Sequence, residues 1–295
     1  MKDLSIIIVS FNTKSLTQQC LDSLIKSLRQ TPNVTVEIIV IDNGSNDGSV
    51  ELLKKYAKKY PSLLSVIYNS QNAGFARANN EALAIAQAKY ILFLNSDVTV
   101  NEVNFEDLVY YLNQNDNVGV LTVKVILPSG KLDWACHRGM PTIWRSLTYF
   151  SKLELLFSKI PKLRKYFGGY HLKHLDLNTI HEIDSPSGAF YLTRKSILDK
   201  TGGFDTRFFM YGEDLDLSYR IKKLGYKVIY YPLFSVIHYK YQSGLKRGIK
   251  STEFKTKDHF YEAMKVFYDK HASADRPRIL SKIVFLLINI KKKIS

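Results

Sequence analysis

The chain has 295 residues, with 42 Lys and Arg against 27 Asp and Glu, a formal net charge of +15. This length suits one α/β domain with extensions or two small domains, and the composition is that of a soluble globular protein. No stretch reaches the roughly 20 apolar residues of a membrane span, and the N-terminus lacks a secretory signal, so we expect a cytoplasmic protein.

The charge and the two cysteines add two weaker constraints. The basic excess favours anionic partners such as phosphorylated molecules, nucleic acid or anionic lipid, although a solvated basic surface explains it equally well. Cys20 and Cys136 fit neither a zinc site nor a disulfide framework, which favours a reducing compartment.

The first third of the chain alternates between two patterns, apolar runs typical of buried strands and segments of helical period. This alternation predicts an α/β fold with a Rossmann-like, mostly parallel central sheet and helices on both faces. We expect strands at 4–9, 36–41, 64–68 and 90–94, and helices within 16–28, 52–60 and 76–88. Further on, we expect a strand at 190–193 and a helix from about 213 to 224.

Polar residues follow each of the first four strands, at 10–12, 42–49, 69–74 and 95–97. The carboxyl ends of parallel strands form the edge at which such sheets bind ligands, so these segments predict a binding rim. Independent turns remain the alternative, because Asn, Asp, Gly and Ser are turn formers. The chain lacks a glycine-rich G-x-G-x-x-G after the first strand and also lacks a Walker sequence, which disfavours a nucleotide-dependent oxidoreductase and a P-loop ATPase.

These segments together resemble glycosyltransferase family 2, in its bacterial rhamnosyltransferase-like branch. The resemblance covers roughly residues 4–245 and rests on the ordered segments 8–12, 40–49, 72–76, 94–97, 202–205 and 213–220, with His238. It implies the GT-A fold, a nucleoside-diphosphate sugar as donor (dTDP or UDP), Mg²⁺ or Mn²⁺ as cofactor, and inversion at the anomeric carbon.

The donor site is expected at the binding rim. A carboxylate at Asp42 can accept the imide N–H of uracil or thymine, and an Asx turn is the alternative role. The loop around Gly74 opens a helix whose N-terminus favours an anionic ligand, while Arg77 is as well explained by a solvated helix face. The predicted donor-binding residues are Ser10, Phe11, Asn12, Asp42, Asn72, Gly74, Phe75, Arg77, Asn80, Ser96 and Gly188.

Asn95-Ser96-Asp97 stands where the family has its metal-binding D-x-D, with Asn95 in place of the first acid. Mg²⁺ and Mn²⁺ take oxygen ligands and often only one or two from protein, so Asp97 with diphosphate oxygens and waters would suffice. His238 is a candidate second ligand and would favour Mn²⁺; ordinary packing of a histidine after a strand is the alternative.

Glu213, Asp214 and Asp216 open a predicted helix, where the helix dipole stabilises negative charge whatever their function. Aromatic and apolar neighbours should desolvate one carboxylate and raise its basicity. The resemblance makes Asp214 the base that deprotonates the acceptor hydroxyl, with Glu213 orienting it or touching the donor sugar. Trp134, His137 and Tyr211 are candidate acceptor contacts, because aromatic rings stack on sugars; core packing explains Trp134 equally well.

We expect a GT-A domain at 1–250, with a nucleotide-binding half at 1–125 and an acceptor half at 126–250 that carries a helical insertion at 142–180. The insertion and the helical tail at 251–295 combine apolar and basic residues, which predicts an anionic membrane surface as partner, or else a docked helix or oligomer contact. The acceptor is then a glycan or a polyprenyl-diphosphate-linked glycan, and the protein sits on the inner face of the cell membrane.

Two other functions compete with this hypothesis. A non-catalytic basic protein that binds nucleic acid or membrane would need no acidic rim, so we expect no nucleic acid partner. A nucleotidyltransferase would need a basic phosphate-binding loop after the first strand, which the chain lacks.

Overall fold

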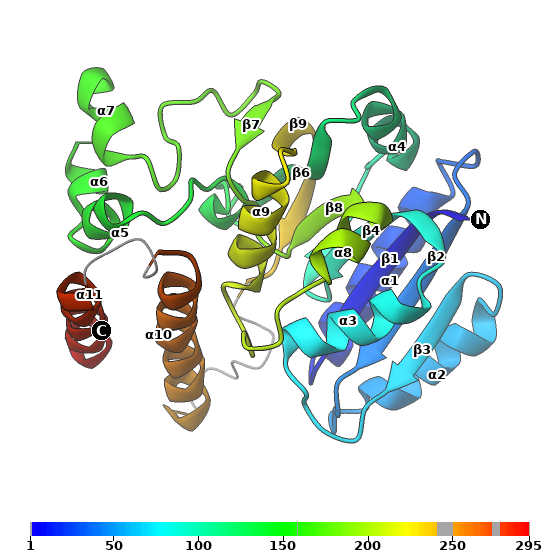
Figure 1. Ribbon diagram of the computed structural model, residues 1–295. Helices are drawn as coiled ribbons and strands as arrows, with labels where there is room; N and C mark the ends of the chain where they lie inside the picture. The colour runs from blue at the N-terminus through cyan, green and yellow to red at the C-terminus, as the bar shows by residue number, and fades with distance from the viewer. Residues whose placement is uncertain (1, 158, 241–249, 273–277, 295) are drawn as a thin grey trace.

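The computed structural model describes residues 2–157, 159–240, 250–272 and 278–294, and these form a nine-stranded sheet in the order β3-β2-β1-β4-β8-β6-β9-β5, with β7 paired to β9 (Figure 1). The α/β class predicted from the sequence is confirmed. The strands are β1 (Lys2–Ser10), β2 (Val36–Asp42), β3 (Leu64–Tyr68), β4 (Ala88–Asn95), β5 (Val98–Thr99), β6 (Val118–Ile126), β7 (His181–Ile183), β8 (Phe190–Arg194) and β9 (Lys227–His238).

The strands β3, β2, β1 and β4 run parallel, as the alternation of strands and helices predicts. Chain order reverses at β1, whose neighbours are β2 on one side and β4 on the other. In the β1 registers, Ser10 pairs with Asp42, and Val9 pairs with Asn95. A crevice outside the carboxyl ends of strands at such a reversal is where α/β sheets bind ligands.

Beyond β4 the sheet is mixed. β8 runs antiparallel to β4 and β6, β6 and β9 are parallel, and β5 and β7 both run antiparallel to β9. This arrangement brings the end of β9, with His238, beside Val98 in β5. Residues that are far apart in the chain therefore meet beside the end of β4.

Helices cover both faces of the sheet (Figure 1). Their amphipathic sequences explain the packing: in α1, Cys20, Leu21 and Leu24 are fully buried against the strands. Asn104 caps α4 by accepting hydrogen bonds from the next turn. The helices beside the sheet are α1 (Lys14–Leu28), α2 (Ser49–Lys59), α3 (Phe75–Ile85), α4 (Phe105–Gln114), α8 (Lys195–Thr201) and α9 (Glu213–Lys223).

One helix ends earlier than the sequence predicts. The alanine-rich run 76–88 predicts a continuous helix, but α3 ends at Ile85 because Ala86 is extended, with φ −66° and ψ 130°. Ala86 and Ala88 are both buried, and Ala88 starts β4. Because alanine is small, it fits a buried strand or the turn before it as well as a helix, and tertiary packing decides between the two states.

The remaining helices lie together beside the sheet (Figure 1). α5 (Ile143–Phe150), α6 (Leu153–Leu156) and α7 (Pro161–Phe167) fall within the predicted insertion, after the short 3₁₀ turn Trp134–Cys136. α10 (Lys250–Ala272) lies between α11 (Arg278–Ile294) and the sheet, and α11 lies next to α5 (Figure 1). Among the described residues, no helix is both long enough and apolar enough to cross a membrane.

Candidate active site

A cavity of about 2090 Å³ lies outside the carboxyl ends of β1 and β4 and continues beneath α10 and α11. Twelve of the residues predicted for the site line it, although they come from most of the length of the chain. They are Phe11, Asn12, Asn72, Phe75, Ser96, Asp97, Trp134, Gly188, Tyr211, Glu213, Asp214 and His238. The predicted metal ligands and the predicted catalytic pair thus share one cavity.

Asp97 and His238 are in contact, and both are buried. Nε2 of His238 lies 3.2 Å from Oδ1 of Asp97, and Nδ1 lies 2.9 Å from Oδ2 of Asp133. Burial lowers the pKa of His238, but the hydrogen bonds to Asp133 and Asp97 outweigh it and raise this pKa to about 9. Lys240 pairs with the other oxygen of Asp133 at 2.9 Å. The imidazole is therefore held in one orientation, with Nε2 directed at Asp97.

Glu213 and Asp214 occupy the first turn of α9, after Gly212 in the left-handed conformation. Oδ2 of Asp214 accepts a hydrogen bond from Nη2 of Arg138 at 2.7 Å, and Oδ1 accepts one from the Leu215 amide at 2.7 Å. Both partners of the ion pair are buried, so the guanidinium compensates a carboxylate that has lost most of its water.

Glu213 has a different environment from its neighbour. Burial, followed by the negative charge of Asp214, raises the pKa of Glu213 to about 8. Its Oε2 atom is buried and has no hydrogen-bond partner among the described residues. The sequence predicted one carboxylate with raised basicity in this pair, and in the structure the raised pKa belongs to Glu213.

Two glycines allow close packing around the Phe75 and Phe209 side of the cavity. Gly74 has φ +88°, and a Cβ there would lie 2.8 Å from the Phe209 carbonyl oxygen, which accepts a hydrogen bond from the Phe75 amide. A Cβ on Gly188 would lie 3.3 Å from the Phe75 ring. Side chains at either position would push into Phe75 or Phe209, so glycine keeps this part of the cavity open.

Besides Gly74, five predicted site residues do not line the cavity. Asp42 is buried, with Oδ2 accepting from the Ser45 amide and Oδ1 without a hydrogen-bond partner among the described residues. Ser10 forms a hydrogen bond with Thr17 in the core. The side chain of Asn80 donates to the Phe204 carbonyl and accepts from the Phe204 amide.

The remaining two residues, Arg77 and His137, make contacts outside the cavity. The Arg77 side chain is 68% exposed and pairs with Glu81 at 3.5 Å, which fits the solvated helix face that the sequence left open. His137 is fully buried, with Nε2 2.7 Å from Nε2 of His181 on β7. The pairing of β7 with β9 brings these rings together inside the fold, away from the cavity.

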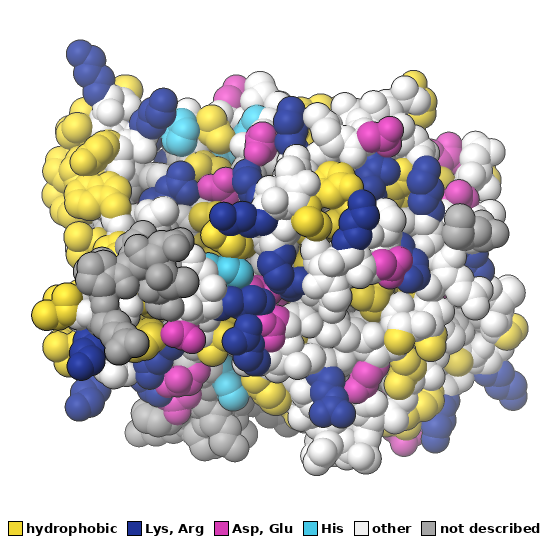
Figure 2. Space-filling view, in the orientation of Figure 1, with side chains coloured by type: hydrophobic (Ala, Val, Ile, Leu, Met, Phe, Trp, Pro, Cys, Tyr) yellow, Lys and Arg dark blue, Asp and Glu magenta, His cyan; other side chains and the backbone are white. Residues whose placement is uncertain are grey.

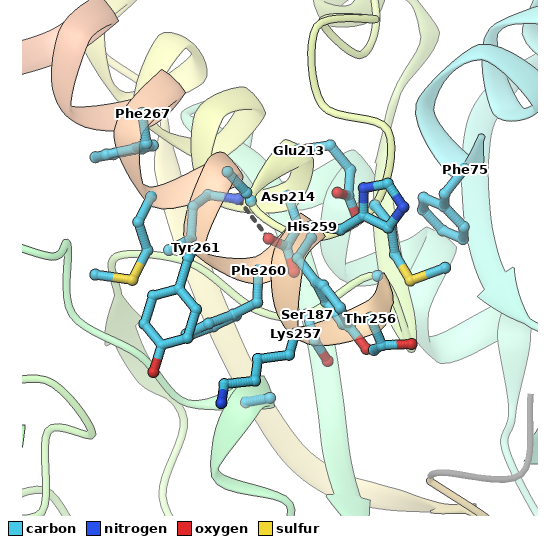
Figure 3. Close-up of a pocket in the computed structure, with 18 of the residues that line it drawn as sticks. Phe75, Ser187, Glu213, Asp214, Thr256, Lys257, His259, Phe260, Tyr261 and Phe267 are labelled. Carbon is cyan, nitrogen blue, oxygen red and sulfur yellow. Dashed lines mark hydrogen bonds between the residues drawn. The ribbon is translucent and has the colours of Figure 1, made fainter. Parts of the chain in front are cut away.

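The sequence did not identify Arg138 or the part of α10 that lines the cavity. Figure 3 shows Glu213 and Asp214 with Thr256, Lys257 and His259 of α10 around them. His259 stacks on Phe209 with ring centroids 4.6 Å apart. At the other end of α10, Lys270 and His271 contact Asp216 at 2.7 and 2.6 Å. The predicted C-terminal tail thus begins with a helix that docks over α9.

The sequence model of the family described as Glycosyl transferase family 2 matches residues 5–176, more than half of the chain. This chain belongs to glycosyltransferase family 2. The match confirms the resemblance noted in the sequence and, with relatives that are named as glycosyltransferases, makes the protein a glycosyltransferase enzyme.

Two relatives align over most of this glycosyltransferase. The rhamnosyltransferase WbbL of Escherichia coli is 29% identical over 244 residues, which cover 79% of this chain and 82% of that protein. An N-acetylglucosaminyl-diphospho-decaprenol L-rhamnosyltransferase of Mycobacterium tuberculosis is 24% identical over 234 residues, or 76% of this chain and 73% of that one.

Other similar proteins are longer than this glycosyltransferase. The poly(ribitol-phosphate) beta-glucosyltransferase of Bacillus spizizenii is 32% identical over 139 residues, which span 47% of this chain but 20% of that protein. Among solved structures, GalNAc-T7 with UDP, GalNAc and Mn²⁺ superposes with a TM-score of 0.60 at 18% identity, over 96% of this chain and 54% of that one. At this identity the likeness shows the fold, which is the GT-A fold expected from the sequence.

Proposed function

We propose that this enzyme is an inverting, metal-dependent glycosyltransferase that moves a sugar from a dTDP- or UDP-linked donor to a hydroxyl of a glycan acceptor. The observation that carries the proposal is the shared cavity: Asp97 and the pair Glu213–Asp214 line it together. Similarity to two rhamnosyltransferases favours rhamnose as the sugar.

The residues near Asp97 fit a divalent cation. Oδ1 of Asn95 is buried and has no hydrogen-bond partner among the described residues, and Asn95 lines the cavity with Asp97. His238 presents Nε2 on the same side while Asp133 holds Nδ1, the arrangement that orients a metal-binding imidazole. With its pKa raised to about 9, the ring would have to release the Nε2 proton for a cation to take that position. Mn²⁺ accepts this mixture of oxygen and nitrogen ligands. The GalNAc-T7 structure contains Mn²⁺.

The fit is that of an open site rather than a closed cage. No group of three or more His, Cys, Asp or Glu side chains is positioned to hold a metal among the described residues. Hard cations at phosphate sites commonly take one or two protein ligands, with phosphate oxygens and water completing the shell. When bound, the cation would neutralise charge on the diphosphate leaving group.

The catalytic assignments follow from the environment of each carboxylate. Asp214 accepts one hydrogen bond on each oxygen, which fixes its orientation and leaves lone pairs for the proton of the acceptor hydroxyl. A base positioned in this way contributes roughly 10²–10⁴ in rate. Glu213, which holds its proton at neutral pH, can instead donate a hydrogen bond to a sugar oxygen.

Donor and acceptor contacts complete the proposal. Oδ1 of Asp42 has no hydrogen-bond partner among the described residues and suits the imide N–H of uracil or thymine, although Asp42 itself does not line the cavity. Phe11, Asn12 and Asn72 line the cavity on this donor side. Trp134 and Tyr211 line the cavity and offer rings on which an acceptor sugar can stack. The decaprenol-linked acceptor named for the Mycobacterium tuberculosis relative supports a lipid-linked glycan, held at the inner face of the cell membrane.

Calorimetry with UDP and dTDP, with and without Mn²⁺, tests the donor assignment. We expect one of the two nucleotides to bind much more tightly with the metal than without it, and a panel of nucleotide sugars to reveal one that the enzyme hydrolyses slowly without an acceptor. Binding that ignores the metal, or oligonucleotide binding with no nucleotide effect, would contradict the proposal and favour the non-catalytic basic protein.

A further inference from the structure

Exposed apolar side chains gather on the side of the molecule away from β1–β3 (Figure 2). Figure 2 shows hydrophobic side chains gathered at the edge where Figure 1 places α5–α7 and α11. On α11 the exposed apolar residues are Ile279, Ile283, Leu286, Leu287, Ile290 and Ile294. Their spacing places them on one face of the helix. Large exposed apolar patches of this kind mark interaction sites.

The opposite face of α11 packs against the protein, so the helix has a fixed orientation. Ile288 is buried, the Phe285 ring lies 5.8 Å from Tyr268 of α10, and Lys292 pairs with Asp258 at 2.8 Å. Lys291 lies 6.0 Å from the Phe150 ring at the end of α5. The exposed stripe therefore stays directed outward beside α5–α7, where Leu155, Leu156 and Tyr166 are also exposed.

The charges that α5–α7 and α11 themselves carry are almost all positive, while α10 places Asp258 and Glu262 beside Lys292. Residues 143–167 contain six Lys or Arg and one acid, Glu154, which is buried against His171 and Lys173. Residues 279–294 contain four lysines and no acid. Apolar side chains flanked by lysines fit the surface of an anionic bilayer, where the chains enter the headgroup region and the ammonium groups meet lipid phosphates. A protein partner would not require this uniform sign.

The cavity that holds the catalytic carboxylates reaches this same surface. Leu147 of α5 and Leu287, Ile290 and Ile294 of α11 line the cavity and are also exposed to solvent. A side chain with both properties stands at a cavity mouth. The mouth between α5 and α11 is therefore bordered by the apolar stripe.

We propose that α5–α7 and α11 form a docking surface for an anionic bilayer, with the cavity mouth between α5 and α11 opening onto it. An acceptor anchored in that bilayer then reaches Asp214 without leaving the membrane surface, while the donor binds at the ends of β1 and β4. This role of the mouth rests on the proposed function, whereas the docking itself does not.

Vesicle sedimentation of the full chain tests the docking. We expect binding to vesicles of phosphatidylglycerol and phosphatidylcholine, much weaker binding to phosphatidylcholine alone, and loss of binding at high salt. The double variant Ile283→Ser/Leu286→Ser should bind at least about tenfold more weakly, because it removes apolar groups that enter the bilayer. The matched control is Ile85→Ser on α3: Ile85 is 50% exposed and Ile283 47%.

A second pair of variants tests the charge. Lys282→Gln/Lys293→Gln should weaken binding to anionic vesicles by at least about tenfold, since each lysine near such a surface contributes roughly fivefold. Lys54→Gln/Lys58→Gln on α2, an equal change of charge on the opposite side of the sheet, should leave it unchanged. If both double variants lost vesicle binding equally, binding would depend only on the overall charge of the protein, and the proposal would be overturned.

Two other results separate this inference from its alternatives. If the stripe instead joins two copies of the chain, Ile283→Ser/Leu286→Ser will convert a dimer to a monomer in sedimentation velocity and leave vesicle binding intact, which overturns the proposal. Metal-dependent nucleotide binding, measured on the same samples, reports on the proposed function alone. Nucleotide binding without vesicle binding would overturn only the docking proposal. Vesicle binding without nucleotide binding would overturn only the donor assignment.

Discussion

The guanidinium of Arg138 donates from Nη2 to Oδ2 of Asp214 at 2.7 Å, in a pair that is almost fully buried. The same nitrogen also donates to the Pro186 carbonyl at 2.7 Å, which fixes the arginine to the segment before β8. The proposed base is therefore held from two directions, by its own helix and by the loop that follows the 3₁₀ turn at Trp134–Cys136.

Replacing Asp214 with asparagine should remove the base and keep the fold. The new amide side chain would retain an oxygen that can accept from Arg138, so the buried guanidinium would keep a partner. We expect kcat for sugar transfer to fall by at least about 10²-fold, with nucleotide affinity unchanged within about twofold. Asp199→Asn, at an exposed aspartate on α8, is the matched control. Turnover that survives in Asp214→Asn would remove Asp214 from its role.

Replacing Arg138 with glutamine should destabilise the protein, because it leaves the carboxylate of Asp214 buried without its cation. Removing one partner of such a pair costs roughly 3–5 kcal/mol. Urea unfolding should show this loss, and the double variant Arg138→Gln/Asp214→Asn should recover part of it, since no charge is then left unpaired. Additive losses in the double variant would show that the pair is not coupled.

Replacing Asp97 with asparagine should separate metal-dependent from metal-independent nucleotide binding. The variant keeps the size and polarity of the side chain but loses the charge that a divalent cation requires. We expect calorimetry to show that Mn²⁺ no longer strengthens nucleotide binding, while binding measured without metal stays at the wild-type value. An Mn²⁺ effect of wild-type size in Asp97→Asn would refute the metal assignment.

The strands β1 and β2 were predictable because they are mostly buried and read as nearly unbroken β-branched runs. β1 and β2 each carry such a run, and both appear within two residues of the expected bounds. β6 has the same character at Val118–Ile126, so its signal was present in the sequence although it was not predicted. The mixed pairing of β8 could not be predicted, because strand direction depends on contacts that are distant in the chain.

The candidate site also contains residues that the sequence could identify and residues that it could not. Asp97 and Asp214 could be found because each follows a recognisable local pattern at the end of a strand or the start of a helix. Arg138 lies 76 residues from Asp214, and nothing local to either indicates that they pair. The same holds for α10, whose His271 contacts Asp216 across 55 residues. His137 was predicted at the site but is buried away from the cavity, whereas Trp134 of the same segment lines it. The sequence does not show which rings of an aromatic-rich segment face a cavity.

The raised pKa of Glu213 predicts a pH dependence of stability. In the unfolded chain this group loses its proton near pH 4.5, whereas burial beside Asp214 keeps it protonated in the folded state up to about pH 8. The folded state then binds more protons between these values, so this contribution to stability is complete below pH 4.5 and is lost as the pH rises through 8.

Glu213→Gln removes that contribution and should flatten the profile. Relative to wild type, the variant should gain at least about 1 kcal/mol in unfolding free energy between pH 5 and pH 8.5, measured by urea titration at each pH. Glu51→Gln, at an exposed position on α2, should follow the wild-type profile. Parallel profiles for wild type and Glu213→Gln would mean that Glu213 is already ionised at pH 5.

Gly188→Ala should narrow the cavity at a residue predicted to bind the donor, where we expect the donor sugar to lie. The added methyl group would lie 3.3 Å from the Phe75 ring and 3.8 Å from Oδ1 of Asn95, close enough to displace the ring without entering the core. Because the methyl group intrudes on the sugar and not on the base or phosphates, we expect KM for the nucleotide sugar to rise about tenfold while the Kd of the nucleotide alone is unchanged. A parallel rise in both constants would place the crowding at the nucleotide, and an unchanged KM would mean that the sugar lies elsewhere in the cavity.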